Sequence, residues 1–202
     1  MRHDFTAQRI PAGFAWLNPP PAFAFERGLV VTTRAGTDFW QRTHYGFRRD
    51  DGHCLLARRS GDFSLETMVE SSPRTRYDQC GLMVRLDGEN WIKASAEYED
   101  PQLSRLGSVV TNVGFSDWAT QDISPAVRSL GHRISRRGCD FLIEWSANGD
   151  QWRQMRIAHL HALAAGSELE IGIYACSPSG GSFKARFAYI DIADNRWQAP
   201  DP

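Results

Sequence analysis

The stretch YDQCGLMVRLDGENWIKASAEYED, Tyr77–Asp100, carries the clearest signal for the fold. Apolar residues alternate with other residues on both sides of Asp87-Gly88. An Asp-Gly pair between two alternating runs is typical of a β-hairpin turn. The sequence therefore predicts two antiparallel strands, Gln79–Leu86 and Trp91–Tyr98.

Each of these strands has one apolar face, because side chains alternate between the two sides of a strand. The apolar side carries Cys80, Leu82, Val84, Leu86, Ile92, Ala94 and Ala96. The other side carries Gln79, Gly81, Met83, Arg85, Trp91, Lys93, Ser95 and Glu97. We expect pairing of the apolar sets to bring Gly81 close to Glu97, with Gly81 marking a close approach by another group. One face should join the core, while the other mixes aromatic and ionisable groups.

The rest of the chain also reads as short strands separated by turns. The strand-like runs are 29–33, 53–59, 62–70, 106–113, 132–137, 139–146, 152–157, 169–176 and 183–192. We expect 132–137 to pair with 139–146, and 169–176 with 183–192. Only 124–130 and 158–165 are candidate helices. This pattern predicts an all-β fold, an antiparallel sandwich of two sheets.

Length and composition narrow the class of protein. A chain of 202 residues is expected to form one β-sandwich domain, with its core at about 16–192 and a short C-terminal tail at 193–202. The net charge of -1 gives no electrostatic case for nucleic acid or an acidic membrane. No stretch reaches the roughly 18 apolar residues of a membrane helix, and the first residues lack the apolar segment of a signal peptide.

The four cysteines, Cys54, Cys80, Cys139 and Cys176, are widely separated and lie in or beside strand-like runs. Such cysteines are most often buried thiols, which favours a reducing compartment and a cytoplasmic protein. We expect no metal and no cofactor. His159 and His161 lack two further ligands for a metal, and no phosphate-binding glycine loop precedes a helix.

The polar face of the hairpin is the candidate site. Aromatic rings cover the apolar face of a sugar, and nearby polar groups bond its hydroxyls. The candidate ligand-binding residues are Gln79, Trp91, Lys93, Glu97, His44, Tyr45 and Trp118. Trp40 is also available, and Asp117-Trp118 is expected in a rim loop. The alternatives are a solvated Lys93–Glu97 pair on an ordinary surface and tryptophans packed in the core.

Several motifs in order resemble one known family. They are WLNPP (16–20), DFW (38–40), THYGF (43–47), YDQCGLM (77–83), WIKA (91–94) with EY (97–98), SVVT (108–111), SDW (116–118) and SANG (146–149). Together they resemble the concanavalin A-like jelly-roll family of unknown function whose fungal member is named for regulation of enolase. They are also similar to the C-terminal β-sandwich of some family-43 glycosidases. The resemblance implies that Gln79, Lys93 and Glu97 lie on a concave sheet face.

Three functions remain open. Non-catalytic binding of a carbohydrate or small polar ligand on the concave face is favoured. The first alternative is a protein-interaction regulator of a metabolic enzyme, with an arginine-rich edge at 48–49 and 58–59 as a partner surface. The second is a glycoside-active enzyme that uses Glu97, with Asp78, Glu99 or Asp117 as a second carboxyl group. Catalysis is less favoured because the pattern places only Glu97 on the face.

Overall fold

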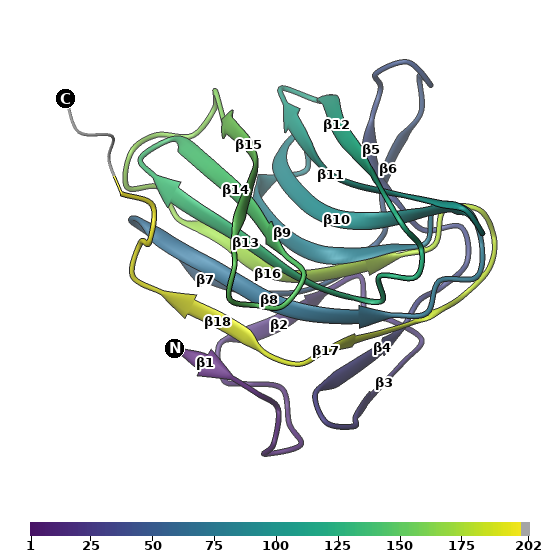
Figure 1. The fold of residues 1–202 in the computed structure, drawn as a ribbon. Coiled ribbons are helices and arrows are strands. Elements are labelled where there is room, and N and C mark those ends of the chain that lie inside the picture. The colour runs from purple at the N-terminus through teal and green to yellow at the C-terminus, as the bar shows by residue number, and fades with distance from the viewer. Residues whose placement is uncertain (199–202) are drawn as a thin grey trace.

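The computed structural model describes residues 1–198 and contains eighteen β-strands and no helix over that range. The chain folds into two large sheets packed face to face, with a small hairpin against the second (Figure 1). Every strand pairing within these sheets is antiparallel. The predicted all-β sandwich of two antiparallel sheets is confirmed.

The first sheet has nine strands in the order β15-β14-β13-β8-β17-β4-β3, with β18 beside β8 and β1 beside β18. Its strands are β1 Arg2–His3, β3 Ala22–Phe25, β4 Leu29–Thr32, β8 Phe63–Ser71, β13 Ser129–Arg137, β14 Asp140–Ser146, β15 Arg153–His159, β17 Lys184–Phe187 and β18 Ile190–Ala193. The second sheet has seven strands in the order β12-β11-β10-β9-β16-β7-β2. Its strands are β2 Phe14–Leu17, β7 His53–Arg59, β9 Gln79–Asp87, β10 Asn90–Asp100, β11 Leu103–Asn112, β12 Phe115–Ile123 and β16 Leu169–Cys176.

The predicted hairpin lies at the centre of the seven-stranded sheet as β9 and β10. Its register pairs Cys80 with Ala96 and Leu82 with Ala94. This puts the apolar sets of both strands on the same face, where they pack into the main core between the sheets. Alternation therefore determines which face is internal.

The expected close approach at Gly81 is confirmed, since a Cβ there would collide with the Ala94 carbonyl oxygen of the neighbouring strand. Three other details of the prediction are wrong. Gly81 lies opposite Ser95, and Glu97 lies opposite Gln79. The stretch 169–176 pairs with β7 and β9, whereas 183–192 forms strands of the other sheet, so the two do not form a hairpin. The candidate helices at 124–130 and 158–165 are turns and strand ends, which are too short for helices once their apolar residues join the sheets.

The outer face of the seven-stranded sheet is also covered. A small hairpin, β5 Phe39–Gln41 and β6 Arg48–Asp50, packs over it near β12 (Figure 1). Beneath the hairpin lies a second apolar cluster of Phe39, Trp40, Cys54, Leu56, Met83, Trp91, Val109, Tyr174 and Cys176. We call this cluster the outer core. It was not predicted, because these residues are spread over six strands.

The remainder of the chain agrees in part with expectation. Cys54, Cys80 and Cys176 are buried and Cys139 is half-buried, which confirms that the thiols are mostly buried.

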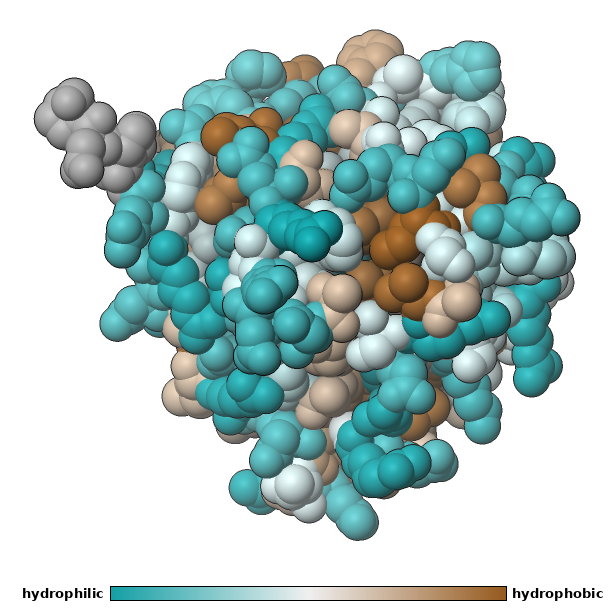
Figure 2. Space-filling view, in the orientation of Figure 1, coloured by the Kyte–Doolittle hydropathy of each residue, from teal (hydrophilic) through white to brown (hydrophobic). Residues whose placement is uncertain are grey.

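The tail predicted at 193–202 is anchored at Arg196, which bonds Glu66 and Asp191, and residues 199–202 lie outside the described part. On the face shown in Figure 2, hydrophilic side chains predominate, and apolar atoms lie in a hollow right of centre and in a smaller patch at the upper left. No helix within residues 1–198 has the length and apolar character to cross a membrane.

Candidate functional site

A pocket of about 390 Å³ opens between the outer face of the seven-stranded sheet and the β5–β6 hairpin. Its aromatic lining comprises Trp40, Tyr45, Phe47, Tyr77 and Trp118. Its charged and amide lining comprises Asp38, Arg49, Gln79, Lys93 and Glu97. This combination of several rings with a few convergent polar groups is typical of a small-molecule site.

The loop of the β5–β6 hairpin builds one aromatic wall. It turns sharply, with positive φ angles at Arg42 (55°), His44 (62°) and Gly46 (76°). The indole N–H of Trp40 donates to the Thr43 carbonyl oxygen at 2.9 Å, which fixes the ring against the loop. The short loop thus holds an aromatic side chain at the mouth of the pocket.

The rings of this wall contact one another. The Tyr45 ring packs edge-on against Trp40, with 5.5 Å between ring centroids, and stacks on Phe47 at 5.6 Å and 21°. Tyr45 and Phe47 remain 52% and 44% exposed. Trp118 lines the pocket from β12 and is 38% exposed. Three rings are therefore open to a ligand. Trp118 lies within a strand and not in the expected rim loop.

Lys93 lies at the floor of the pocket and is almost fully buried. Its ammonium group donates to the Phe39 carbonyl oxygen at 2.8 Å and lies 3.5 Å from a carboxylate oxygen of Asp38. The alternative of a solvated Lys93–Glu97 pair is wrong, because Lys93 is buried and pairs with Asp38. Glu97 is four strand positions away, about 13 Å between Cα atoms. The cation is instead neutralised by Asp38, which the hairpin brings over the sheet.

Glu97 lies at the other end of the pocket. One of its carboxyl oxygens accepts a hydrogen bond from the Gln79 amide nitrogen at 2.6 Å. Burial raises the pKa of Glu97 to about 8, with further increases from the charges of Asp38 and Glu99, against the opposing effects of Lys93 and Gln79. The raised pKa favours the uncharged form of the Glu97 carboxyl group at neutral pH.

Five of the seven predicted site residues line the pocket, and the other two, Trp91 and His44, do not. Gln79, Tyr45, Lys93, Glu97 and Trp118 all line the pocket. Trp91 is fully buried in the outer core against Phe39, so it supports the floor and is not the exposed wall that we expected. His44 is exposed and packs against the edge of Tyr45, outside the pocket lining.

The pocket also has residues that sequence reasoning did not assign to the site. They are Asp38, Phe47, Arg49 and Tyr77, and Trp40 was noted only as an available ring. The segment 38–40 was part of the family resemblance, which was the available signal for Asp38 and Trp40. Nothing in strand periodicity indicates that a distant hairpin closes over β9 and β10.

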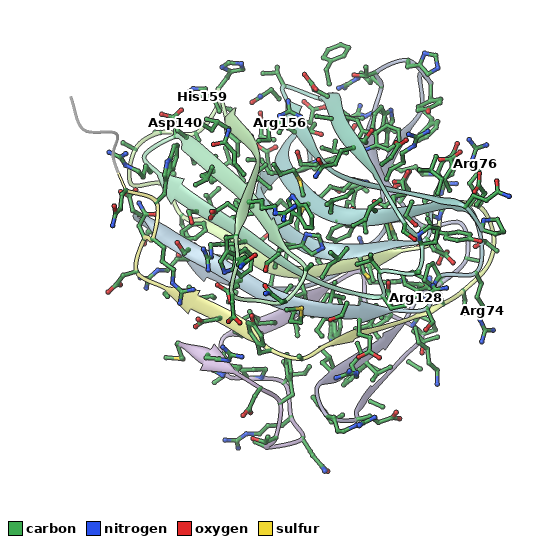
Figure 3. All side chains as sticks on the ribbon, in the orientation of Figure 1. Arg74, Arg76, Arg128, Asp140, Arg156 and His159 are labelled. Carbon is green, nitrogen blue, oxygen red and sulfur yellow. The ribbon has the colours of Figure 1, made fainter. Side chains whose placement is uncertain are left out.

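None of the three expected partner carboxyl groups lines the pocket. Asp78 is buried and accepts the backbone N–H groups of Arg74 and Thr75. Glu99 pairs with Arg76, and Asp117 pairs with Arg156 (Figure 3 labels Arg74, Arg76 and Arg156). Asp38 is the second carboxyl group of the pocket.

Among residues 1–198, no group of three or more His, Cys, Asp or Glu side chains is arranged to hold a metal ion. His159 bonds Asp140 at 2.6 Å, and the rings of His159 and His161 lie 5.1 Å apart. Figure 3 shows Asp140 and His159 together at the ends of β14 and β15, on the opposite side of the view from Arg76.

Comparison with known proteins relates this sandwich to others. A family described as "Protein of unknown function (DUF1349)" matches residues 16–195. A Saccharomyces cerevisiae protein named "Regulation of enolase protein 1" is 35% identical over 174 residues, which cover 86% of this chain and 85% of that protein.

Solved structures show the same fold. A functionally unknown protein from Saccharomyces cerevisiae superimposes with a TM-score of 0.82 at 32% identity, over 91% of this chain and 97% of that one. GH43B of a Bacteroides ovatus xyloglucan locus matches with a TM-score of 0.73 at 16% identity, over 96% of this chain and 39% of that one. The Bacillus subtilis carbohydrate-binding module CBM66 matches with a TM-score of 0.57 at 15% identity, over 90% and 96%.

Proposed function

This chain belongs to the DUF1349 family, and we propose that its pocket binds a neutral carbohydrate or a similar polyhydroxylated ligand without catalysing a reaction. One observation carries the proposal. Exposed rings on β12 and on the β5–β6 hairpin face the same pocket as the polar groups of Gln79, Lys93 and Glu97. Rings cover the apolar side of a sugar, while the polar groups bond its hydroxyls.

The charges of the pocket favour a neutral ligand. Lys93 is paired with Asp38, and Arg49 is paired with Asp51 at 2.9 Å. Glu97 is uncharged at neutral pH because its pKa is raised to about 8. The pocket therefore holds no uncompensated charge that would select an anion or a cation. The name of the Bacillus subtilis module, a carbohydrate-binding module, is consistent with this proposal.

A second candidate is the regulation of a metabolic enzyme by direct contact. It is favoured by the name of the yeast relative, at 35% identity. In this structure Arg48 and Arg49 lie on β6 beside the pocket, and Arg58 and Arg59 lie at the end of β7. All four of these arginines are exposed, and three of them pair with nearby carboxylates: Arg48 with Glu89, Arg49 with Asp51 and Arg58 with Glu168.

The test is titration calorimetry at pH 6.5 with three probes: xyloglucan heptasaccharide, xylotetraose and trigalacturonate. The proposal expects a neutral probe to bind and trigalacturonate to bind more weakly. Tyr45→Ala and Trp118→Ala should each weaken binding by about 5-fold or more, since stacking of a sugar on an exposed ring contributes on the order of 1 kcal/mol or more. Phe23→Ala is the matched control, because it removes an exposed ring on β3 of the other sheet.

Either of two results would overturn this proposal and favour another function. Failure of both neutral probes to bind at millimolar concentration, together with binding of purified enolase, would favour the regulatory candidate. Release of reducing sugar by the wild type, abolished by Asp38→Asn, would show that the two carboxyl groups of the pocket are catalytic.

We also propose a reducing compartment, such as the cytoplasm, for this protein. Three of its four thiols are buried, and burial raises the pKa of Cys80 to about 12, which keeps it as an unreactive thiol. Thiol titration of the native protein should therefore be slow and reach four groups on unfolding. Isolation of the protein from its own cells with an intact disulfide would contradict this.

A further inference from the structure

A chain of hydrogen bonds leads from the outer core to the pocket. The hydroxyl group of Tyr174, on β16, donates to the Gln79 side-chain oxygen at 3.0 Å. The Gln79 amide nitrogen donates both to the Tyr77 carbonyl oxygen at 3.2 Å and to a carboxyl oxygen of Glu97 at 2.6 Å. Tyr174 and Gln79 are buried, with 1% and 2% exposure.

These contacts determine which way the Gln79 amide faces. The Tyr77 carbonyl oxygen can only accept, so the amide nitrogen must face it. The Gln79 oxygen then faces Tyr174, and burial keeps the pKa of Tyr174 well above its ordinary value, so its hydroxyl group remains a donor. Both donors of the Gln79 amide are thereby used, and one of them reaches Glu97.

The same contacts place the proton of Glu97 when its carboxyl group is neutral. Oε2 accepts from Gln79 and therefore acts as the carbonyl oxygen. The proton then lies on Oε1, which has no hydrogen-bond partner within residues 1–198, while the residue lines the pocket. Resting on the proposed function, we propose that Glu97 donates a hydrogen bond to an acceptor oxygen of the bound ligand, and that Gln79 and Tyr174 are positioning residues that hold its carboxyl group for this role.

The charged groups around Glu97 are compatible with a neutral carboxyl group. On β10, Lys93 is paired with Asp38 from the hairpin side, and Glu99 is paired with Arg76. On the neighbouring β11, Arg105 lies opposite Glu97 in register and is paired with Asp122 of β12. Each cation near Glu97 thus already has a carboxylate partner.

The remaining titratable groups that face Glu97 are hydroxyl and thiol groups. Tyr77 precedes β9, while Tyr174 and Cys176 lie on β16. Burial raises the pKa of each of these three groups. None of them supplies a positive charge that would ionise Glu97. Burial raises the pKa of Glu97 itself to about 8, in agreement with the donor role.

This role narrows the ligand class. A protonated carboxyl group bonds an ether, hydroxyl or carbonyl oxygen, and these are the oxygens of a neutral sugar. A cationic ligand, such as an amino sugar, would instead need the carboxylate form. Affinity for a neutral sugar should therefore fall when Glu97 ionises, and affinity for an amino sugar should rise.

The first arm of the test needs no ligand. Carbon-13 NMR of protein labelled at the glutamate carboxyl carbons, assigned by comparison with Glu97→Gln, should show Glu97 titrating near pH 8. Tyr174→Phe removes the hydrogen bond to the Gln79 oxygen and so holds the amide less tightly. The bond from Gln79 that lowers the Glu97 pKa should then weaken, and the Glu97 midpoint should move upward. Tyr98→Phe, also on this part of the sheet but outside the network, should leave the midpoint unchanged. A Glu97 midpoint near 4.5 in the wild type overturns the proposal.

The second arm measures the affinity for xyloglucan heptasaccharide and xylotetraose from pH 6 to pH 9. A site that needs the protonated form loses affinity as that form becomes scarce, so binding should be about ten-fold weaker at pH 9 than at pH 6. At pH 9, Glu97→Gln should bind about ten-fold more tightly than the wild type, because an amide keeps both the acceptor and the donor. Tyr174→Phe should weaken binding at pH 6 by about three-fold or more.

The two proposals fail in different ways. If neither neutral probe binds at pH 6, the proposed function fails, whatever Glu97 does in the first arm. If a probe binds equally well at pH 6 and pH 9, or Glu97→Gln binds more weakly than the wild type at pH 9, the donor role is refuted while the pocket remains a sugar site.

Discussion

The two faces of the seven-stranded sheet are both buried at its centre, by different partners. The inner face packs against the nine-stranded sheet, and its residues alternate regularly along each strand. The outer face is covered only in part, by the β5–β6 hairpin, and it changes character along a single strand. On β10, Trp91 and Lys93 are buried beneath the hairpin, whereas Glu97 is half-buried and lines the pocket.

This difference shows how a binding site can arise on a sheet. A complete second layer would bury the outer face as fully as the inner one. A two-stranded cover leaves a cavity beside itself, and the side chains at its margin are both held and accessible. The outer core is therefore expected to support the pocket, as the following changes test.

The largest expected effect is on the outer core. Trp91→Ala removes a fully buried ring that packs against Phe39, with 6.2 Å between ring centroids. We expect the free energy of unfolding to fall by about 3–5 kcal/mol in urea denaturation. A loss below about 1 kcal/mol would show that the hairpin does not form a core with the sheet.

A matched pair on β9 compares the two faces directly. Leu82 is fully buried on the inner face and Met83 is fully buried on the outer face. Leu82→Ala and Met83→Ala should each lower the free energy of unfolding by about 2–5 kcal/mol. If only Leu82→Ala lowers the free energy of unfolding by this amount, the outer face behaves as surface, and the claim that both faces are buried is wrong.

The free energy of unfolding should depend on pH through His132, a polar residue of the main core. His132 points into the main core, is fully buried and has no partner for either ring nitrogen among the described residues. Burial lowers the pKa of His132 to about 4, below its ordinary value of 6.5. Between these values the unfolded chain binds more protons than the folded one, so stability falls as pH decreases, by about 3 kcal/mol in total.

The measurement for His132 is urea denaturation from pH 7.5 to pH 4. His132→Leu should remove this part of the acid loss and change stability at pH 7.5 by only about 1 kcal/mol, because it replaces an unpaired polar group with an apolar one. His3→Leu, at an edge strand, is the control. Equal acid sensitivity of the wild type and His132→Leu would contradict the assignment.

The smallest effect on stability is expected at the mouth of the pocket. Tyr45 is 52% exposed, and its ring packs against the rings of Trp40, His44 and Phe47 in the hairpin. Tyr45→Ala should change the free energy of unfolding by less than about 1 kcal/mol while weakening sugar binding. A large destabilisation would mean that the ring supports the hairpin and is not free for a ligand.

The sequence predicted the inner face much better than the outer one. Alternation around Leu82 and Ala94 determined the register and the core, because a period of two has one solution when one face must be buried. Gln79, Lys93 and Glu97 were correctly placed on one face. Their partners were not foreseen, since Asp38 reaches Lys93 from 55 positions away in the sequence, through a hairpin that local pattern does not position.

The central claim is that the pocket of the outer face binds a neutral sugar. Proton–nitrogen NMR of the tryptophan indole groups during titration with xyloglucan heptasaccharide and xylotetraose tests it most directly. We predict shifts of the Trp40 and Trp118 signals, which line the pocket, with Trp145 and Trp152 at the nine-stranded sheet unchanged. Unchanged Trp40 and Trp118 signals with both sugars, or shifts confined to Trp145 and Trp152, would contradict the claim.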